Sequence, residues 1–202
     1  GLAAAAAMLG LTRTGTWVLP ETPPGWSLAP TVDMHLDRLG AIARVLADFG
    51  IRLGLEILGP RACRTGRGVP FVTRYADLGR VLGPLRERPN VGLLLDAFHL
   101  HAAAESPAAA LAGWGIERVV WAHVADLPAD APDDLDAIRD EDRGLPGERG
   151  LVDVAGFLAR LAAAAPPYDG PVTVEPLGGC RSLKGLDAAT IARRARQSIR
   201  TF

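Results

Sequence analysis

The sequence predicts a parallel α/β protein of the (β/α)8-barrel class, and three observations lead to it. Short apolar runs alternate with longer segments of helical periodicity along the 202 residues. Enough residues separate successive runs for the crossovers that parallel pairing requires. No GxGxxG or GxxxxGK[ST] motif follows any run, so a dinucleotide-binding or P-loop sheet has no direct support.

Five segments have the length and residue types of strands, and Gly, Pro or Asn marks at least one end of four of them. They are 15–20, 51–58, 91–96, 117–124 and 171–177. The third, VGLLLD, is apolar up to Asp96 and has the composition of a strand buried on both faces. We expect this strand to lie at the centre of the functional site, because Asp96 at its end is followed closely by two histidines.

Helices are predicted where apolar residues recur at three- and four-residue spacing. In order they are 2–9, stopped by Gly10; 31–49, stopped by Gly50; 75–85, before Pro89; 106–114; one beginning after Asp153; and 187–199. Ser106 followed by Pro107 is a typical helix start, and Asp153 is a typical N-cap. The segments 21–30, 59–70 and 126–142 are expected to be loops rich in Pro, in Gly and Arg, and in acidic residues, respectively.

A barrel of this class typically needs eight strands and about 250 residues, so five strands fall short of it. The sequence has no initiator methionine and begins inside a predicted helix. We therefore expect residues 1–202 to form one partial barrel domain that is truncated at its N-terminus and contains the last five βα units.

The composition is that of an ordinary soluble globular protein, with 49% hydrophobic and 22% charged residues. A formal net charge of −1 and a pI near 6.5 give no basic field to attract nucleic acid or a membrane surface. Cys63 and Cys180 lack CxxC spacing, which indicates reduced thiols in a cytoplasmic protein. The expected partner is a small molecule, and homo-oligomerisation is left open.

Four predicted strands end in an ionisable side chain, and in a parallel barrel all these ends lie on one rim. The four residues are Glu56, Asp96, His123 and Glu175. Period-two alternation places Gly54, Gly92, Leu94, Val119, Trp121 and Thr173 on the same face as these four residues. The other face is uniformly aliphatic and should pack on the helices; it carries Leu53, Leu55, Leu93, Leu95, Val120, Val172 and Val174.

Three carboxylates and one imidazole favour Mn²⁺ or Mg²⁺, with Co²⁺ or Zn²⁺ also compatible. Any one of these residues alone would more simply be a surface residue at a strand end. Their coincidence at equivalent positions predicts one shared site for a divalent metal, with Mn²⁺ the first choice.

Several segments, in order, resemble the sugar phosphate isomerase/epimerase family, the xylose isomerase-like TIM barrels that include tagatose 3-epimerase, hydroxypyruvate isomerase and inosose dehydratase. They are GLEILGP, NVGLLLDAFHL, WAHVADLP, DRGLPGERGLVDV and YDGPVTVEPL, between Ile51 and Leu177. The family's PGEG turn has an extra arginine here, Arg149, and the acidic loop before it is longer.

The resemblance implies an enzyme that isomerises or epimerises a ketose or related sugar through an ene-diolate by proton transfer. It implies the same metal ligands that the strand ends give. Glu56 and Glu175 would be the catalytic proton-transfer groups, and His99 and Arg143 would bind substrate.

The residues also allow three other functional interpretations. An inosose dehydratase-like lyase would use the same metal site, and an inactive barrel fragment would leave sheet edges exposed. A DNA repair enzyme like endonuclease IV needs many histidines, whereas the chain has four.

A few candidate residues have weaker signals. His101 could be a further ligand, although a capping or solvated histidine is the simpler interpretation, and His35 is expected on a helix surface. Asp126 could orient His123 from behind. The cysteines are expected to have no role, and the arginines of segment 61–74 could bind a substrate phosphate or simply be solvated.

Overall fold

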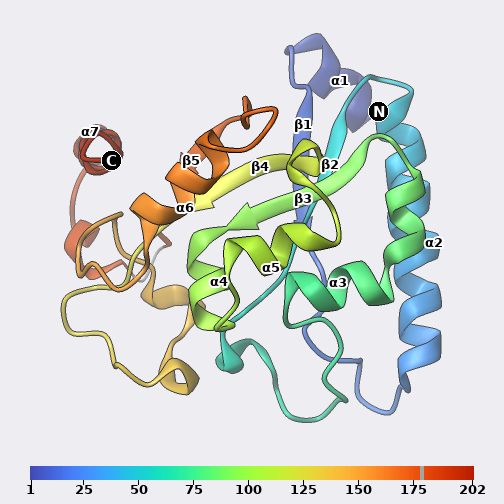
Figure 1. The fold of residues 1–202 in the computed structure, drawn as a ribbon, viewed down its shortest axis with the longest axis horizontal. Helices are drawn as coiled ribbons and strands as arrows, with labels where there is room; N and C mark the ends of the chain where they lie inside the picture. Colours follow the sequence, from blue (N-terminus) through green and yellow to red (C-terminus); the bar gives the residue numbers. More distant parts are fainter. Residues whose placement is uncertain (178–179) are drawn as a thin grey trace.

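A parallel sheet forms the centre of the molecule in the computed structural model, which describes residues 1–177 and 180–202. Its five strands follow the chain in the order β1-β2-β3-β4-β5, with every pair parallel. They are β1 Arg13–Trp17, β2 Arg52–Glu56, β3 Val91–Asp96, β4 Val119–Val124 and β5 Val172–Val174. Figure 1 shows this open half-barrel, which confirms the predicted α/β barrel class.

Most helices lie between successive strands, as the crossovers require, whereas the first precedes β1 and the last follows β5. They are α1 Leu2–Met8, α2 Leu28–Ala47, α3 Tyr75–Val81, α4 Ala97–Ala102, α5 Pro107–Ala112, α6 Val154–Ala162 and α7 Ala188–Ile199. In Figure 1, α2 stands at one end of the sheet and α6 and α7 at the other, with α3 to α5 between them. Two predicted N-caps are confirmed, because Ser106 accepts from Ala109 N–H and Asp153 from Gly156 N–H.

Besides shifts of one to three residues at other element ends, three differences from the predicted boundaries stand out. The helix expected over 75–85 divides into α3 and a 3-10 turn, Gly83–Glu87, where Pro84 interrupts the α-helical hydrogen bonds. Residues 97–102, which had no predicted structure, form α4, because the Asp96 carboxylate caps it by accepting from Phe98 N–H and His99 N–H. The last strand has three residues and ends before Glu175.

The two faces of the sheet are filled differently. The aliphatic outer face packs against the helices as predicted, with Leu53, Leu55, Leu93 and Leu95 all 1% exposed or less. The inner face has glycine on β1 and β2, and the Leu94 side chain of β3 occupies the space above them. A Cβ atom on Gly54 would lie 3.0 Å from Leu94 Cβ. Glycine on β1 and β2 thus leaves the room in which the Leu94 side chain crosses the inner face.

One facing prediction is wrong, on β4. Val119 was expected on the inner face and Val120 on the outer one, but Val119 packs in the helix-side core and Val120 approaches Gly92 of β3. The register between β3 and β4 shifts between Leu93 and Leu94, so β4 has one extra residue there. A bulge of this kind resets the alternation, and Trp121 and His123 keep their predicted face.

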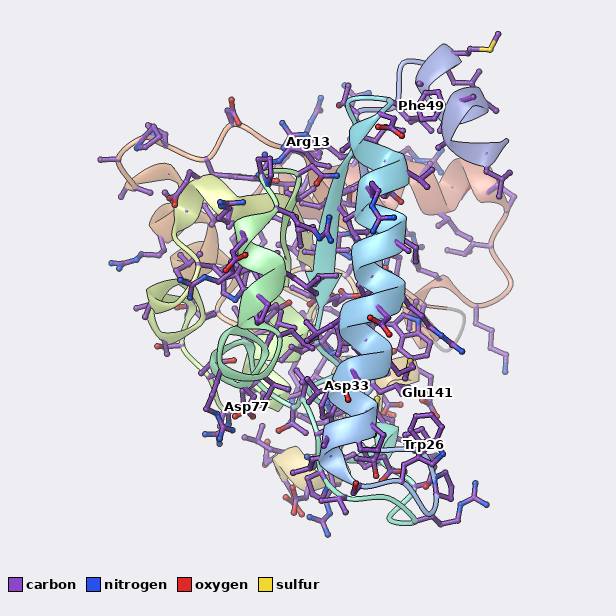
Figure 2. All side chains as sticks on the ribbon, turned by 90° about the vertical axis from the view of Figure 1, so that its right-hand side faces the viewer. Arg13, Trp26, Asp33, Phe49, Asp77 and Glu141 are labelled. Carbon is purple, nitrogen blue, oxygen red and sulfur yellow. The ribbon has the colours of Figure 1, made fainter. Side chains whose placement is uncertain are left out.

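His35 on α2 is buried, not exposed as predicted. It is 6% exposed, its Nδ1 lies 2.7 Å from the Thr31 carbonyl oxygen, and its ring packs 4.9 Å from that of Phe71. The buried row of α2 runs through position 35, and burial lowers the pKa of this histidine. Figure 2 views α2 from outside, with the exposed side chains of Asp33 and Phe49 near its two ends.

Among the described residues, none of the helices combines the length and the apolar character needed to cross a membrane.

Candidate metal centre

Four predicted side chains meet at the carboxyl end of the sheet. Glu56 ends β2, Asp96 ends β3, His123 lies one residue before the end of β4, and Glu175 follows β5. Each offers one ligand atom, and these atoms all lie within 4.8 Å of one another. In the part of the chain that the structure describes, these four are the His, Cys, Asp and Glu side chains that lie close enough together to hold one metal ion.

The imidazole of His123 lies at the centre of the group. Its Nδ1 is 3.1 Å from Glu175 Oε2, 3.6 Å from Glu56 Oε1 and 4.0 Å from Asp96 Oδ2. Trp121 supports the ring edge-on at 5.9 Å, and its own Nε1 donates to Thr173 Oγ1. The inner-face residues of β4 and β5 thus hold His123 towards the carboxylates.

The donor set fits a divalent ion. Two of the buried side-chain atoms that lack a hydrogen-bond partner among the described residues are Glu56 Oε1 and His123 Nδ1, and both belong to this group. Leaving such atoms unpaired is costly unless another partner satisfies them. Donors about 2.1 Å from one ion lie up to about 4.2 Å apart, so a movement of some tenths of an ångström would bring all four ligands onto it.

Arg143 occupies the inner wall of the site, although it comes from the long loop between β4 and α6. Its side chain is 2% exposed, and its Nη1 donates to Asp96 Oδ2 at 2.6 Å and to Glu175 Oε2 at 2.8 Å. Nε donates to Asp140 Oδ1 at 2.9 Å, and the guanidinium lies 4.7 Å above the Phe98 ring. Burial alone would lower the pKa of Arg143, but Asp96 and Asp140 outweigh it and raise that pKa.

Asp96 is fully buried and uses both oxygens. Oδ1 accepts from the first turn of α4, and Oδ2 accepts from Arg143. Burial alone would raise its pKa, but Arg143 and then His99 outweigh burial and hold the pKa below its ordinary value. The carboxylate is therefore ionised and already oriented before any ligand binds.

His99 lies behind Arg143 and has no exposed surface. Gly59 N–H donates to its Nδ1 at 3.2 Å, and Arg143 Nη2 lies 2.8 Å from its Nε2. Burial lowers the pKa of His99 to about 4, with Asp96 opposing that shift and Arg143 adding to it. The ring is thus neutral at pH 7. It contacts the guanidinium of Arg143 and does not reach the surface of the site.

Glu56 and His123 have raised pKa values. Burial raises the pKa of Glu56 to about 7, with His123 opposing the shift. Burial alone would lower the pKa of His123, but Glu175 and Glu56 outweigh it and raise that pKa to about 9. Without an ion, His123 therefore carries a positive charge at neutral pH, and a metal ion would take the place of that proton.

Asp126 does not orient His123, contrary to the sequence-based expectation. Its carboxylate, fully buried, accepts hydrogen bonds from backbone N–H groups of Leu127 and of residues 149–152. Glu148 of the same turn accepts from Leu145 N–H and Ser182 Oγ. Asp126 thus anchors the PGERG turn, and Arg149 extends from it to Asp133.

The weaker candidates lie outside the group of four. His101 is half-buried on the far side of α4, where it lines a groove of about 340 Å³ with residues of α5 and α6. Both cysteines are free, as predicted. Cys63 lies near Asp140 and Arg143, and burial with the charge of Asp140 raises its pKa to about 11.

Two residues that support the site were not predicted from the sequence. Asp140 orients Arg143, and the three-residue spacing between an acidic and a basic residue is the signal that could have indicated this pair. Phe98 supplies the ring beneath the guanidinium, and its place between Asp96 and His99 in the sequence is a further indication.

Comparison with known proteins gives relatives of one kind. Over 126 residues the chain is 29% identical to the inosose isomerase of Bacillus subtilis (strain 168), a stretch that is 62% of this chain and 41% of that protein. A xylose isomerase domain protein of Alicyclobacillus acidocaldarius superposes with a TM-score of 0.78 at 30% identity, covering 98% of this chain and 66% of that one. The crystal structure of the IolI protein with a bound zinc atom superposes with a TM-score of 0.74 at 20% identity, covering 98% and 65%.

The chain therefore spans two fifths of the matched isomerase and about two thirds of each of these two solved structures. The family model described as "Xylose isomerase-like TIM barrel" matches residues 2–202, so the chain belongs to that family.

Proposed function

We propose that this chain is a divalent-metal-dependent isomerase or epimerase that acts on a ketose or a related sugar, with Mn²⁺ as the preferred ion. The observation that carries the proposal is the convergence of four donor groups from four neighbouring strands on one point. The matched inosose isomerase supports sugar isomerisation as the reaction class. Three oxygen donors and one nitrogen donor suit Mn²⁺ better than a thiolate-preferring ion.

Glu56, Asp96, His123 and Glu175 would hold the ion. When bound, it would polarise a carbonyl and the adjacent hydroxyl of the sugar, which lowers the free energy of the ene-diolate. Asp96 is suited to a purely binding role, because both of its oxygens are already engaged and it is fully buried.

Glu56 and Glu175 would move the proton. They come from β2 and from the end of β5, with β3 and β4 between them, so they approach the centre from two sides. One carboxylate would remove the proton from the substrate carbon, and the other would deliver a proton to the opposite face. This arrangement accounts for epimerisation as well as for isomerisation.

Arg143 would bind the substrate oxygens and stabilise their developing negative charge. Its guanidinium is already fixed by Asp96, Asp140 and Glu175, so little reorganisation is needed. We assign His99 to the same substrate-binding function, acting through Arg143, because its Nε2 lies 2.8 Å from Arg143 Nη2 and the ring has no exposed surface.

The test is exchange of the substrate α-proton with solvent deuterium, measured by NMR during a screen of ketoses and inososes with added Mn²⁺. Glu175→Gln keeps an oxygen donor for the metal but removes the proton acceptor, so we expect metal binding to persist and exchange to stop. Glu87→Gln is the control, because Glu87 is exposed at the opposite end of β3.

Unchanged exchange in Glu175→Gln would refute the assignment of that residue. Loss of water from an inosose, seen as a dehydrated product, would instead identify the chain as a lyase on the same site. Metal binding without turnover of any sugar would contradict the proposed activity.

A further inference from the structure

Strands β2 and β3 separate just where their ligands begin. Their parallel pairing runs through Leu53–Val91 and Gly54–Gly92 to Leu55–Leu93 and stops there. By contrast, β3 and β4 stay paired to the last position, where Asp96 is opposite His123. The gap at the rim therefore lies between Glu56 and Asp96.

The separation leaves two backbone groups of β3 without a strand partner. In this parallel pair the Asn90 carbonyl faces β2, because Leu53 N–H donates to it, and so residues 92, 94 and 96 direct their backbone groups the same way. The groups beyond the last pair are the Leu94 carbonyl and the Asp96 N–H. Both are buried, and an unpaired buried backbone group is strongly destabilising.

The phenol of Tyr75 takes the place of the missing strand. Its hydroxyl donates to the Leu94 carbonyl oxygen at 2.6 Å and accepts from Asp96 N–H at 3.1 Å. Tyr75 is 1% exposed and is the first residue of α3. One side-chain oxygen thus satisfies both groups that a neighbouring strand would otherwise satisfy.

Tyr75 is itself held from a third element. Its N–H and that of Ala76 donate to the carboxylate of Glu105, at 2.7 and 2.9 Å, from the segment between α4 and α5. The position of the phenol is therefore fixed by α3 and by Glu105 together.

We propose that Tyr75 is a positioning residue for the metal centre, which fixes the backbone of Asp96 and holds β2 and β3 apart so that Glu56 and Asp96 stand at the spacing one ion requires. This inference rests on the proposed metal-dependent function. Tyr75 contributes no ligand atom, and its effect passes through the strand to the carboxylate.

The test compares Tyr75→Phe with Tyr168→Phe, because these are the two tyrosines of the chain. Tyr168 also donates its hydroxyl to a backbone carbonyl, that of Pro171, at the start of β5 and away from the ligands. Dissociation constants for Mn²⁺ and Co²⁺ are measured by calorimetry, and the visible absorption of bound Co²⁺ reports the ligand geometry. We expect Tyr75→Phe to bind either ion about 10- to 100-fold more weakly with a changed Co²⁺ spectrum, and Tyr168→Phe to match the wild type.

Wild-type affinity and an unchanged Co²⁺ spectrum in Tyr75→Phe would overturn the inference while leaving the metal site intact. A wild-type protein that binds neither ion would overturn the metal-dependent function and this inference with it. Glu105→Gln serves if Tyr75→Phe does not fold, because it weakens the anchor of Tyr75 without touching the rim. We then expect a smaller loss of affinity, and no loss would contradict the proposal.

Discussion

Replacing Arg143 by methionine is the most direct test of how the metal-free site is held together. The substitution keeps an apolar stem of similar length but removes the positive charge that pairs with three carboxylates, one of which, Asp96, is fully buried. Removing one partner of a buried ion pair typically costs about 3–5 kcal/mol, because the other charge stays buried and unpaired. Against a usual stability of about 5–15 kcal/mol, this is at least about a fifth of the total.

The assay is urea unfolding followed by tryptophan fluorescence, in EDTA and then with Mn²⁺. An ion at 100 times its dissociation constant should restore about 2.7 kcal/mol, because it binds the folded state alone. Arg80→Met is the matched control: Arg80 pairs with Asp77 at 2.7 Å but is 75% exposed, so its loss should cost about 1 kcal/mol or less. A similarly small loss for Arg143→Met in EDTA would refute the view that Arg143 compensates the buried charge.

Two further predictions concern other buried groups. Asp126→Asn should lower the free energy of unfolding by about 3 kcal/mol, because an amide has one acceptor oxygen to offer the N–H groups of residues 149–152; wild-type stability in urea would contradict this. Burial lowers the pKa of His35, so as the pH drops His35 is protonated in the unfolded chain before it is protonated in the folded one. The free energy of unfolding therefore falls below about pH 6.5. His35→Gln should lose less stability than the wild type between pH 7.5 and 5.5, and equal losses would show that His35 does not contribute.

The strand ends could be predicted because their geometry is fixed by topology. Once apolar runs and crossovers indicate parallel strands, side chains at the carboxyl ends must share one rim, and this alone brought Glu56, Asp96, His123 and Glu175 together. The result required no knowledge of loop paths.

Features that depend on packing between distant elements could not be predicted. The extra residue of β4 has no local signal, since Val119 and Val120 are alike in composition and differ only in what faces them. The burial of His35 depends on which side of α2 meets the core, and a row with Asp33 and Asp37 nearby indicated solvent. The contacts of Arg143 and Tyr75 depend on where a long loop and a short helix dock against β3.

The size of the side chain at position 94 affects the shape of the site. Its side chain stands on the inner face two residues before Asp96 and spreads over Gly15 and Gly54, so it forms the floor beneath the four ligands. Shortening it to alanine would deepen that floor while leaving every ligand in place. Enlarging Gly54 would have the opposite effect and would require a smaller residue at 94 in compensation. The depth of the floor beneath the four ligands can thus be varied through three positions on three strands, without changing any of the ligands.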